Sequence, residues 1–566
     1  MTRRVLVLFA IAASLVTFVQ PARADDQAAT GETHLFLVLY ADGASLEDGR
    51  AAIAAAGGTL RTENAAIGLA EVASTNPAFL EEVRTHGAVK GAARDRSIAT
   101  TRPGMGHKFA DERLDEERVA RRPHSGGPAV KPTPGTDALT GYQWDMKMIG
   151  AQNEDGSPAL EEKGDGVLVG IIDTGIDGTH PDIAPNFSNG LSRNFTVDMP
   201  SIDGDCEYAD CIDPPNVDHD GHGTHVAGTV ASPENALGIT GVAPEATLVN
   251  IRAGQDSGFF FLGPTVDALT YAAENDIDVV NMSFFVDPWL YNCPSADGYL
   301  DAPEGKPTAE ELAEQLMIYE AMHEVLALAN EAGVTMVAAA GNSAFDLDLV
   351  ERPDEISPDF PEGAAYPRVV TDDCLDLPSE GPNVLSVSSV GPSGIKSDFS
   401  NYGLSEITVA APGGYFRDFL GTKQFRSALN EVWAPYPEVV ARANGEVTNG
   451  GGVPSNEFVL RSCTKDAGCA YYQGIQGTSM ASPHVTGVAA LIIGALGGDA
   501  DPALVRSILE QTAADHACPV PATVDYTLVG RPASWNATCV GTPTLNNFYG
   551  NGLVDAAAAV ALAEAS

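Results

Sequence analysis

Short apolar runs alternate with helical patterns over residues 141–566. Runs of this kind are expected of strands buried on both faces of a parallel sheet. They begin near Val167, Thr247, Val279, Val334, Val384 and Ile407, and helical segments lie near Val226, Thr265, Glu310 and Ser479. The alternation predicts one large α/β domain, in which helices cover both faces of a parallel sheet.

A smaller pattern precedes this domain. It is a β-α-β-α alternation followed by a partly extended segment, and it predicts a small α+β domain over residues 25–100. The expected strands are 34–40 and 65–74, the expected helices are 45–56 and 79–85, and the extended segment is 88–99.

Residues 101–140 lack these patterns. They combine mixed charge with the pair Arg121-Arg122 and the run Lys131-Pro-Thr-Pro-Gly135. Such a composition predicts an exposed, cleavable linker between the two domains.

The first 24 residues have the order of a secretory signal peptide. Arg3 and Arg4 precede an apolar run from Val5 to Val19, and the small-residue segment Ala22-Arg-Ala24 follows it. The apolar run is shorter than the roughly 20 residues that a membrane-spanning helix needs. We therefore expect cleavage after Ala24 and a secreted, soluble protein without a membrane anchor.

The eight cysteines are an even count, which in an exported protein points to disulfides. Metal binding is the alternative, but the cysteines lack paired Cys-x-x-Cys spacing. Proximity along the chain suggests the pairs Cys206 with Cys211, Cys463 with Cys469, Cys518 with Cys539, and Cys293 with Cys374.

The chain is strongly acidic, with 77 Asp and Glu against 32 Lys and Arg and a formal net charge of -45. Nucleic acids and anionic membranes would repel such a surface, so neither is an expected partner. The charge is compatible with high solubility, with salt tolerance or with calcium.

Three segments carry residues for nucleophilic catalysis. Asp173 ends the apolar run that begins at Val167, His222 stands among glycines at a helix start, and Ser479 opens a long apolar helix. Each has an ordinary explanation alone, and Ser479 by itself would be taken for a helix cap. Together they supply an acid, a base and a nucleophile, which acyl transfer requires.

The amino-acid sequences of these three segments resemble motifs of the subtilisin-like serine proteases. Asp-Thr-Gly-Ile-Asp at 173–177, His-Gly-Thr-His-Val-Ala-Gly-Thr at 222–229 and Gly-Thr-Ser-Met-Ala-Ser-Pro-His-Val at 477–485 match the family's three signature blocks, in the family's order. The resemblance implies a subtilisin-like fold, a catalytic triad and protein or peptide substrates. It also implies a monomer whose own pro-domain is an intramolecular inhibitor until it is removed.

The family's oxyanion-binding asparagine matches Asn342, which follows the apolar run beginning at Val334. The backbone N–H of Ser479 is the implied second donor. Without the resemblance, an asparagine after a strand would be taken for a turn residue.

The chain departs from the family pattern around the cleft. Extra sequence lies between residues 285 and 310, 342 and 383, and 413 and 474, and each insertion follows a strand. Because carboxyl ends of parallel strands carry the active site, we expect the insertions to form the rim of the cleft. Phe284 and Phe285 replace small residues there; they either narrow or displace the principal substrate pocket or form an ordinary buried aromatic pair.

The resemblance also implies one structural calcium ion. The loop 233–239 has the length and position of a calcium-binding loop in the family, with oxygen ligands that suit a hard cation. The alternative is an exposed turn closed by Gly238, and Gln143 is the candidate for the N-terminal ligand. The implied ligands are Asp182, Asn235, Leu237 and Ile239.

The combined expectation is a secreted serine endopeptidase, made as a zymogen, that works through an acyl-enzyme. One alternative is a protease dedicated to processing secreted peptide precursors. The other is a catalytically silent binding protein that keeps the fold.

Overall fold

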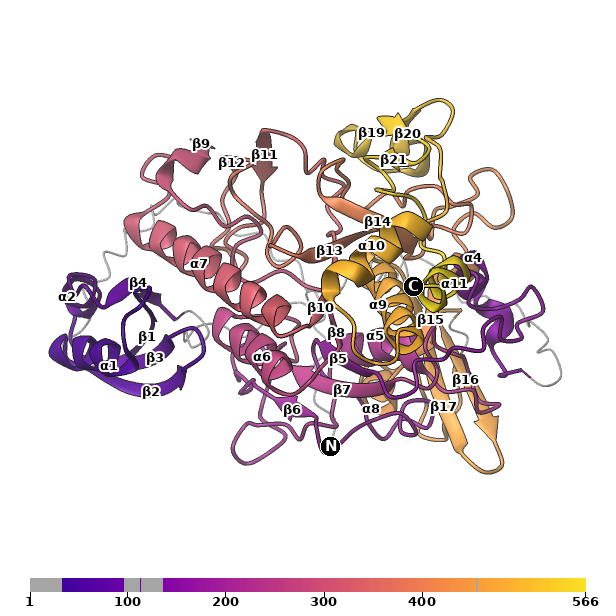
Figure 1. Cartoon of the computed structure of the whole chain (residues 1–566), viewed down its shortest axis with the longest axis horizontal. Coiled ribbons are helices and arrows are strands. Elements are labelled where there is room, and N and C mark those ends of the chain that lie inside the picture. The colour runs from indigo at the N-terminus through magenta and orange to yellow at the C-terminus, as the bar shows by residue number, and fades with distance from the viewer. Residues whose placement is uncertain (1–32, 96–111, 113–135, 455–456) are drawn as a thin grey trace, which may run out of the picture.

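The computed structural model describes residues 33–95, 112, 136–454 and 457–566 (Figure 1). The predicted signal peptide, residues 1–24, lies outside the described residues, as does most of the predicted linker 101–140. The described part of the chain forms a small N-terminal domain and a larger domain beside it.

A parallel sheet of seven strands is the centre of the larger domain in the described part of the chain. In spatial order the strands are β14 (Ile407–Pro412), β13 (Val384–Val390), β10 (Thr335–Ala339), β8 (Val279–Met282), β5 (Leu168–Ile172), β7 (Thr247–Arg252) and β6 (Arg193–Asn194). The first six are the predicted strands. The sequence did not reveal β6, because two residues are too few to form a periodic pattern.

Helices cover both faces of this sheet, as predicted (Figure 1). Neighbouring strand residues point to opposite faces, so Val279 packs in one apolar cluster and Val280 in the other. The first cluster contains α5 (His222–Ala231) and α9 (Thr478–Ala495), and the second contains α6 (Leu262–Glu274) and α7 (Ala309–Glu331).

Helix α9 is the one described helix that is long and apolar enough to cross a membrane. Its apolar window is 89% buried within the protein. The helix is therefore apolar because it lies in the protein core, and Ser479 lies in its first turn.

The N-terminal domain is a four-stranded antiparallel sheet in the order β2-β3-β1-β4, with two helices. Its elements are β1 (His34–Tyr40), α1 (Leu46–Ala55), β2 (Gly58–Asn64), β3 (Leu69–Ser74), α2 (Phe79–Val83) and β4 (Val89–Arg94). The predicted elements all occur, but strand β2 was missed. It starts with a glycine, carries polar residues and lies at the sheet edge, so it lacks an apolar alternation.

This domain packs its sheet against α6 and α7 of the larger domain (Figure 1). Leu39 lies in the same apolar cluster as both helices. Asn64 donates a 2.8 Å hydrogen bond to Asp267 of α6, and Lys90 pairs with Glu320 and Glu324 of α7 at 2.9 and 2.6 Å. Apolar contact and ion pairs thus hold the two domains together.

The insertions form small sheets around the main one. β9 (Tyr299–Asp301), β11 (Glu351–Asp354) and β12 (Arg368–Thr371) form one, and β15 (Val432–Pro435), β16 (Val459–Thr464) and β17 (Gly468–Ile475) form another. The remaining helices and strands are α4 (Trp144–Met148), α8 (Glu438–Ala443), α10 (Pro502–Thr512), β18 (Thr523–Val524), β19 (Ala537–Thr538), β20 (Gly541–Thr542), β21 (Leu545–Asn546) and α11 (Ala556–Glu564).

All eight cysteines lie in the described residues and pair as the sequence suggested. The disulfides are Cys206–Cys211, Cys293–Cys374, Cys463–Cys469 and Cys518–Cys539. Cys293–Cys374 joins the first insertion to the second across 81 residues of sequence. It therefore ties together two segments that both follow strands of the main sheet.

The Cys293–Cys374 disulfide should contribute more to stability than Cys206–Cys211, which spans only 5 residues. In the chain-entropy model the longer loop is worth about 4.5 kcal/mol and the shorter about 2 kcal/mol. We expect Cys293→Ser/Cys374→Ser to lower Tm more than the matched pair Cys206→Ser/Cys211→Ser. Calorimetry in a Ser479→Ala background, which avoids self-digestion, measures both; equal losses would contradict the loop-length argument.

Candidate active site

The four residues predicted for catalysis lie at one edge of the main sheet. Asp173 directly follows β5, and Asn342 follows β10 by three residues. His222 is the first residue of α5 and Ser479 the second of α9. The carboxyl ends of parallel strands meet the starts of two helices here, which is where open α/β sheets place their ligands.

Asp173 and His222 form a buried pair. His222 Nδ1 lies 2.8 Å from Asp173 Oδ1, which also accepts a 2.7 Å hydrogen bond from the Thr174 backbone N–H. Both side chains are almost fully buried, at 0% and 2% exposure. The carboxylate therefore fixes the orientation of the imidazole and leaves Nε2 to face the other side.

Glu112, from the segment predicted as a linker, occupies that other side. Its Oε2 lies 3.1 Å from His222 Nε2, and its Oε1 accepts a 2.6 Å hydrogen bond from Ser479 Oγ. Asn342 Nδ2 donates to the same Oε1 at 2.7 Å. One carboxylate thus contacts His222, Ser479 and Asn342 together.

The carboxylates change the protonation of His222. Burial by itself lowers the pKa of an imidazole, but the charges of Asp173 and Glu112 and their hydrogen bonds outweigh it and raise the pKa of His222 to about 10. In this arrangement the imidazole carries a proton at neutral pH. It cannot act as a base until Glu112 leaves.

Asn342 is held so that its amide N–H2 reaches the same Glu112 oxygen as the Ser479 hydroxyl. Its Oδ1 accepts hydrogen bonds from the Thr478 backbone N–H at 2.8 Å and from Thr478 Oγ1 at 2.9 Å. Gly477 permits the close approach of Glu112, because a Cβ on Gly477 would stand 2.7 Å from Glu112 Oε1. The site can therefore receive an anionic oxygen beside Ser479.

The sequence did not identify two residues of this site. Glu112 is one of several acidic residues in its segment, and nothing local distinguishes it. Asp218 is buried and holds the start of α5 by accepting hydrogen bonds from the Gly221 and Thr224 backbone N–H groups at 2.8 and 3.0 Å. The one signal in the sequence for Asp218 was its place, four residues before the glycine-flanked His222.

The two aromatic residues that follow β8 pack in different apolar clusters, and Phe285 is only partly buried. Phe284 stacks on Phe260 with ring centroids 4.0 Å apart, and it is 7% exposed. Phe285 packs with Leu290 and Tyr291. Phe284 therefore forms a buried aromatic pair with Phe260 rather than with Phe285, and the effect of these residues on the substrate pocket stays a prediction.

The predicted calcium loop is arranged around hydrogen bonds. Asp182 accepts them from Asn235 Nδ2 at 2.8 Å, from the Ile239 backbone N–H at 3.1 Å and from Tyr472 OH at 3.0 Å. Asn235 Oδ1 accepts one from the Leu237 N–H at 2.8 Å. Backbone N–H groups, which repel a cation, face these oxygens. The residues as arranged do not fit a calcium ion, and calcium at this loop stays a prediction.

A second acidic cluster lies beside β6 and β7. Ligand oxygens of Asp198, Glu207 and Asp256 lie within 4.8 Å of one another. Buried Arg252 already pairs with Asp256 at 2.9 Å and lies 3.7 Å from Asp198. Burial and the neighbouring carboxylates raise the pKa of Asp198 to about 7. The set of oxygens suits a hard cation, but Arg252 supplies part of the compensating charge.

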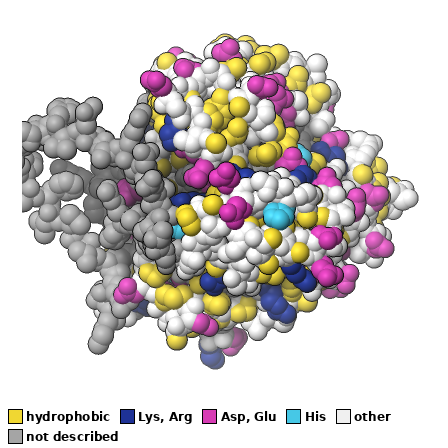
Figure 2. All heavy atoms as spheres, turned by 90° about the vertical axis from the view of Figure 1, so that its left-hand side faces the viewer, with side chains coloured by type: hydrophobic (Ala, Val, Ile, Leu, Met, Phe, Trp, Pro, Cys, Tyr) yellow, Lys and Arg dark blue, Asp and Glu magenta, His cyan; other side chains and the backbone are white. Residues whose placement is uncertain are grey.

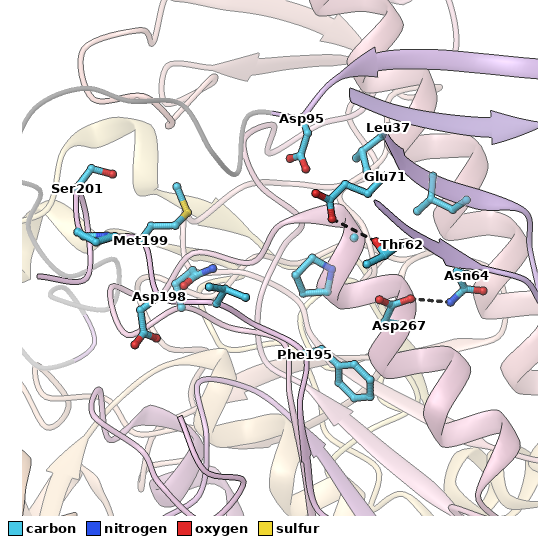
Figure 3. Close-up of a pocket in the computed structure, with 16 residues that line it drawn as sticks. Leu37, Thr62, Asn64, Glu71, Asp95, Phe195, Asp198, Met199, Ser201 and Asp267 are labelled. Atoms are coloured by element: carbon cyan, nitrogen blue, oxygen red, sulfur yellow. Dashed lines mark hydrogen bonds between the residues drawn. The ribbon is translucent and has the colours of Figure 1, made fainter. Parts of the chain in front are cut away.

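A cavity of about 680 Å³ lies between the N-terminal sheet and the larger domain (Figure 3). Leu37 and Thr62 line it from the sheet, Phe195 and Met199 from the loop around β6, and Asp267 from α6. Among the described residues that line it, none is predicted to be catalytic. The cavity is therefore a feature of the domain interface, separate from the Ser479 site.

The surface reflects the composition. In the coloured part of the face shown in Figure 2, Asp and Glu side chains are scattered rather than gathered in one patch. A surface of this kind attracts cationic groups over its full extent.

The comparisons with known proteins agree with the fold. The Subtilase family model matches residues 164–552. An intracellular serine protease of Paenibacillus polymyxa is 29% identical over 338 residues, which are 59% of this chain and 70% of that protease. Subtilisin DY of Bacillus licheniformis is 27% identical over 335 residues, which are 58% of this chain and 78% of subtilisin DY.

One solved structure matches nearly the whole chain. The epidermin leader peptide processing serine protease of Staphylococcus aureus covers 94% of this chain, and this chain covers 99% of that one. The TM-score is 0.60 and the sequence identity 21%, so the match shows a common fold.

Glu112→Gln should lower the pKa of His222, because it removes one of the two carboxylate charges that raise it. The folded pKa of about 10 lies above the unfolded value of about 6.5, so the ion pairs stabilise the folded chain fully below pH 6.5 and this contribution is lost as pH rises toward 10. NMR titration of histidine-labelled protein measures the shift, with exposed Glu304→Gln as control. An unchanged pKa would show that Glu112 does not face the imidazole in solution.

Proposed function

The chain belongs to the subtilase family and is a serine-type endopeptidase, and we propose that it is exported and made as a zymogen, with Asp173, His222 and Ser479 as its catalytic triad. The observation that carries the proposal is the convergence of His222, Ser479 and Asn342 on one carboxylate, with Asp173 behind His222. Its substrates are proteins or peptides.

In the proposed mechanism Ser479 Oγ attacks the carbonyl carbon of the scissile bond. His222 Nε2 takes the hydroxyl proton and then gives it to the leaving amine, while Asp173 stabilises the imidazolium through Nδ1–H. Asn342 Nδ2 and the Ser479 backbone N–H donate to the oxyanion of the tetrahedral intermediate. Water then hydrolyses the acyl-enzyme by the same proton transfers in reverse.

The position of Glu112 supports a latent form of the intact chain. Its Oε1 accepts from Asn342 Nδ2 and Ser479 Oγ, so a side-chain carboxylate takes the place that the substrate's oxyanion would need. Its backbone oxygen also accepts a 3.2 Å hydrogen bond from the Gln476 N–H. We infer that the N-terminal domain and the segment after it form an intramolecular inhibitor, which leaves when the chain is cut.

Export is supported by the disulfides and by the N-terminal sequence. Four disulfides persist in an oxidising compartment and are rare in the cytosol. The signal-like order of residues 1–24 agrees with this location.

A second candidate is a dedicated processing protease for secreted peptide precursors. The insertions that follow β8 and β10 are joined by Cys293–Cys374, which stiffens the loops beside the cleft. A rigid rim restricts which peptides can enter. The leader-processing protease of Staphylococcus aureus shares the fold. A catalytically silent protein is the less favoured alternative, because competent side chains stand at all four positions.

Ser479→Ala should abolish peptide hydrolysis and covalent labelling by a fluorophosphonate, since both need the Oγ nucleophile. Asn342→Ala should keep labelling but reduce kcat about a hundred- to a thousandfold, a range that was measured for such a donor in subtilisin itself. Active-site titration with a fluorophosphonate and steady-state kinetics measure the two effects. If Ser479→Ala were still labelled, a residue other than Ser479 would be the nucleophile.

Glu112→Gln should speed fluorophosphonate labelling of the uncleaved chain, because a neutral amide holds Ser479, Asn342 and protonated His222 less strongly than a carboxylate does. We expect at least a tenfold faster rate, followed as labelled full-length protein on a gel. Glu304→Gln removes an exposed carboxylate and should leave the rate unchanged. Equal labelling rates in wild type and Glu112→Gln would argue against Glu112 as the residue that blocks the active site of the uncleaved chain.

A further inference from the structure

A histidine and two carboxylates meet in the loop between β6 and α5. Ligand atoms of Glu207, Asp213 and His219 lie within 4.8 Å of one another. His219 Nδ1 is 3.1 Å from Asp213 Oδ2, but the two atoms are not in line for a hydrogen bond. Nitrogen and oxygen ligands of a tetrahedral zinc ion stand about 3.4 Å apart. The nitrogen and the oxygen are therefore spaced like two ligands of one metal ion.

Buried Asp198 adds a carboxylate that accepts no hydrogen bond. Asp198 is 4% exposed, and neither of its side-chain oxygens has a hydrogen-bond donor. Arg252 lies 3.7 Å from it, which is too far for a hydrogen bond. A ligand atom of Asp198 lies within 4.8 Å of one of Glu207. A buried carboxylate without donors is costly, and a cation held by Glu207 would compensate its charge.

Arg252 orients these carboxylates but leaves ligand atoms available. It is fully buried and donates to Asp213 Oδ2 at 2.7 Å and to Asp256 Oδ1 at 2.9 Å. Asp213 Oδ1 accepts no hydrogen bond. In metal sites the ligating carboxylates are commonly hydrogen-bonded by such an outer partner. One arginine serves several carboxylates here, so with a neutral His219 the cluster keeps a net negative charge.

A small disulfide ring fixes the position of the outermost ligand. Glu207 lies inside the ring that Cys206–Cys211 closes. The Cys211 carbonyl oxygen accepts a 2.7 Å hydrogen bond from the Asp198 N–H, which attaches the ring to the buried carboxylate. Ligands that are held in place before binding lose little freedom when they bind. Glu207 is exposed and the His219 side chain is 19% exposed, so an ion can reach the cluster from solvent.

We propose that Glu207, Asp213 and His219 bind one zinc ion, with Asp198 as a neighbouring carboxylate that compensates its charge. The protein ligands are His219 Nδ1 and one oxygen each from Glu207 and Asp213, and water completes the tetrahedron. An imidazole nitrogen beside carboxylate oxygens suits zinc, whereas calcium is bound by oxygens alone. The proton on Nδ1 leaves to solvent when the ion binds. This site is separate from the loop 233–239, which was predicted to bind calcium.

The ion connects the loop after β6 with the start of α5. His219 stands three residues before His222, the first residue of α5. Zinc at this point holds the folded arrangement of the loop and takes no part in peptide hydrolysis. A ligand that binds only the folded state raises stability by mass action, so zinc should raise Tm.

Isothermal titration calorimetry of the full-length Ser479→Ala chain, purified without a histidine tag, measures the binding. The protein is dialysed against a chelator and then kept in excess Ca²⁺, so that any calcium-binding loop is filled before Zn²⁺ is added. We expect one Zn²⁺ per chain and a higher Tm. In NMR spectra of histidine-labelled protein, Zn²⁺ should shift one Nδ1 signal, and His219→Ala should lack this signal.

His219→Ala should weaken Zn²⁺ binding by more than about a hundredfold, because losing even an outer partner of a metal ligand costs about ten- to a hundredfold. Glu207→Gln should weaken it at least about tenfold. The matched control Asp210→Asn removes another exposed carboxylate of the same disulfide ring and should leave the affinity unchanged. Because Glu207 is exposed, Glu207→Gln tests the site even if His219→Ala does not fold.

Three results would overturn the proposal. Unchanged Zn²⁺ affinity in Glu207→Gln would place the ion elsewhere on the chain. Zn²⁺ binding that excess Ca²⁺ abolishes would show that the cluster takes a hard cation instead. A wild-type chain that binds no Zn²⁺ under either condition would show that a protonated His219 compensates the carboxylates.

Discussion

Burial of the main sheet on both faces is the constraint on which the rest of the structure depends. Strands β5 and β10 are apolar or small in their central positions, and the sheet lies between two helical layers. Polar side chains can therefore emerge where the strands end. Asp173 and Asn342 stand at two of those ends, and helices α5 and α9 start there with His222 and Ser479. The packing of the core thus decides where chemistry is possible.

The same donors explain both the proposed latency and the proposed catalysis. A site that stabilises an oxyanion must offer N–H and O–H groups toward one point, and such a point also attracts a carboxylate. Glu112 uses this property by contacting Ser479 and Asn342 through one oxygen and His222 through the other. Its charge also raises the pKa of the imidazole, so the proposed inhibition would have a steric and an electrostatic component. A neutral side chain at this position could supply only the steric component.

Local sequence patterns predicted the elements that are long and strongly apolar. The six longer strands of the main sheet and four helices that cover it were found, whereas β2 and β6 were missed because one is polar at an edge and the other has two residues. The calcium loop shows a different limit. Its length and position follow from the sequence, but the direction in which its N–H groups point does not, and that direction decides whether a cation fits.

By itself, the sequence determined the chemistry-bearing blocks around Asp173, His222 and Ser479, because each block is a continuous run whose glycines, strand and helix pattern are local properties. Only the tertiary structure decided what faces them. Glu112 meets Ser479 across 367 residues of sequence. A single acidic residue in a loop carries no periodic signal, and its partner is fixed by how the sheet brings distant strand ends together.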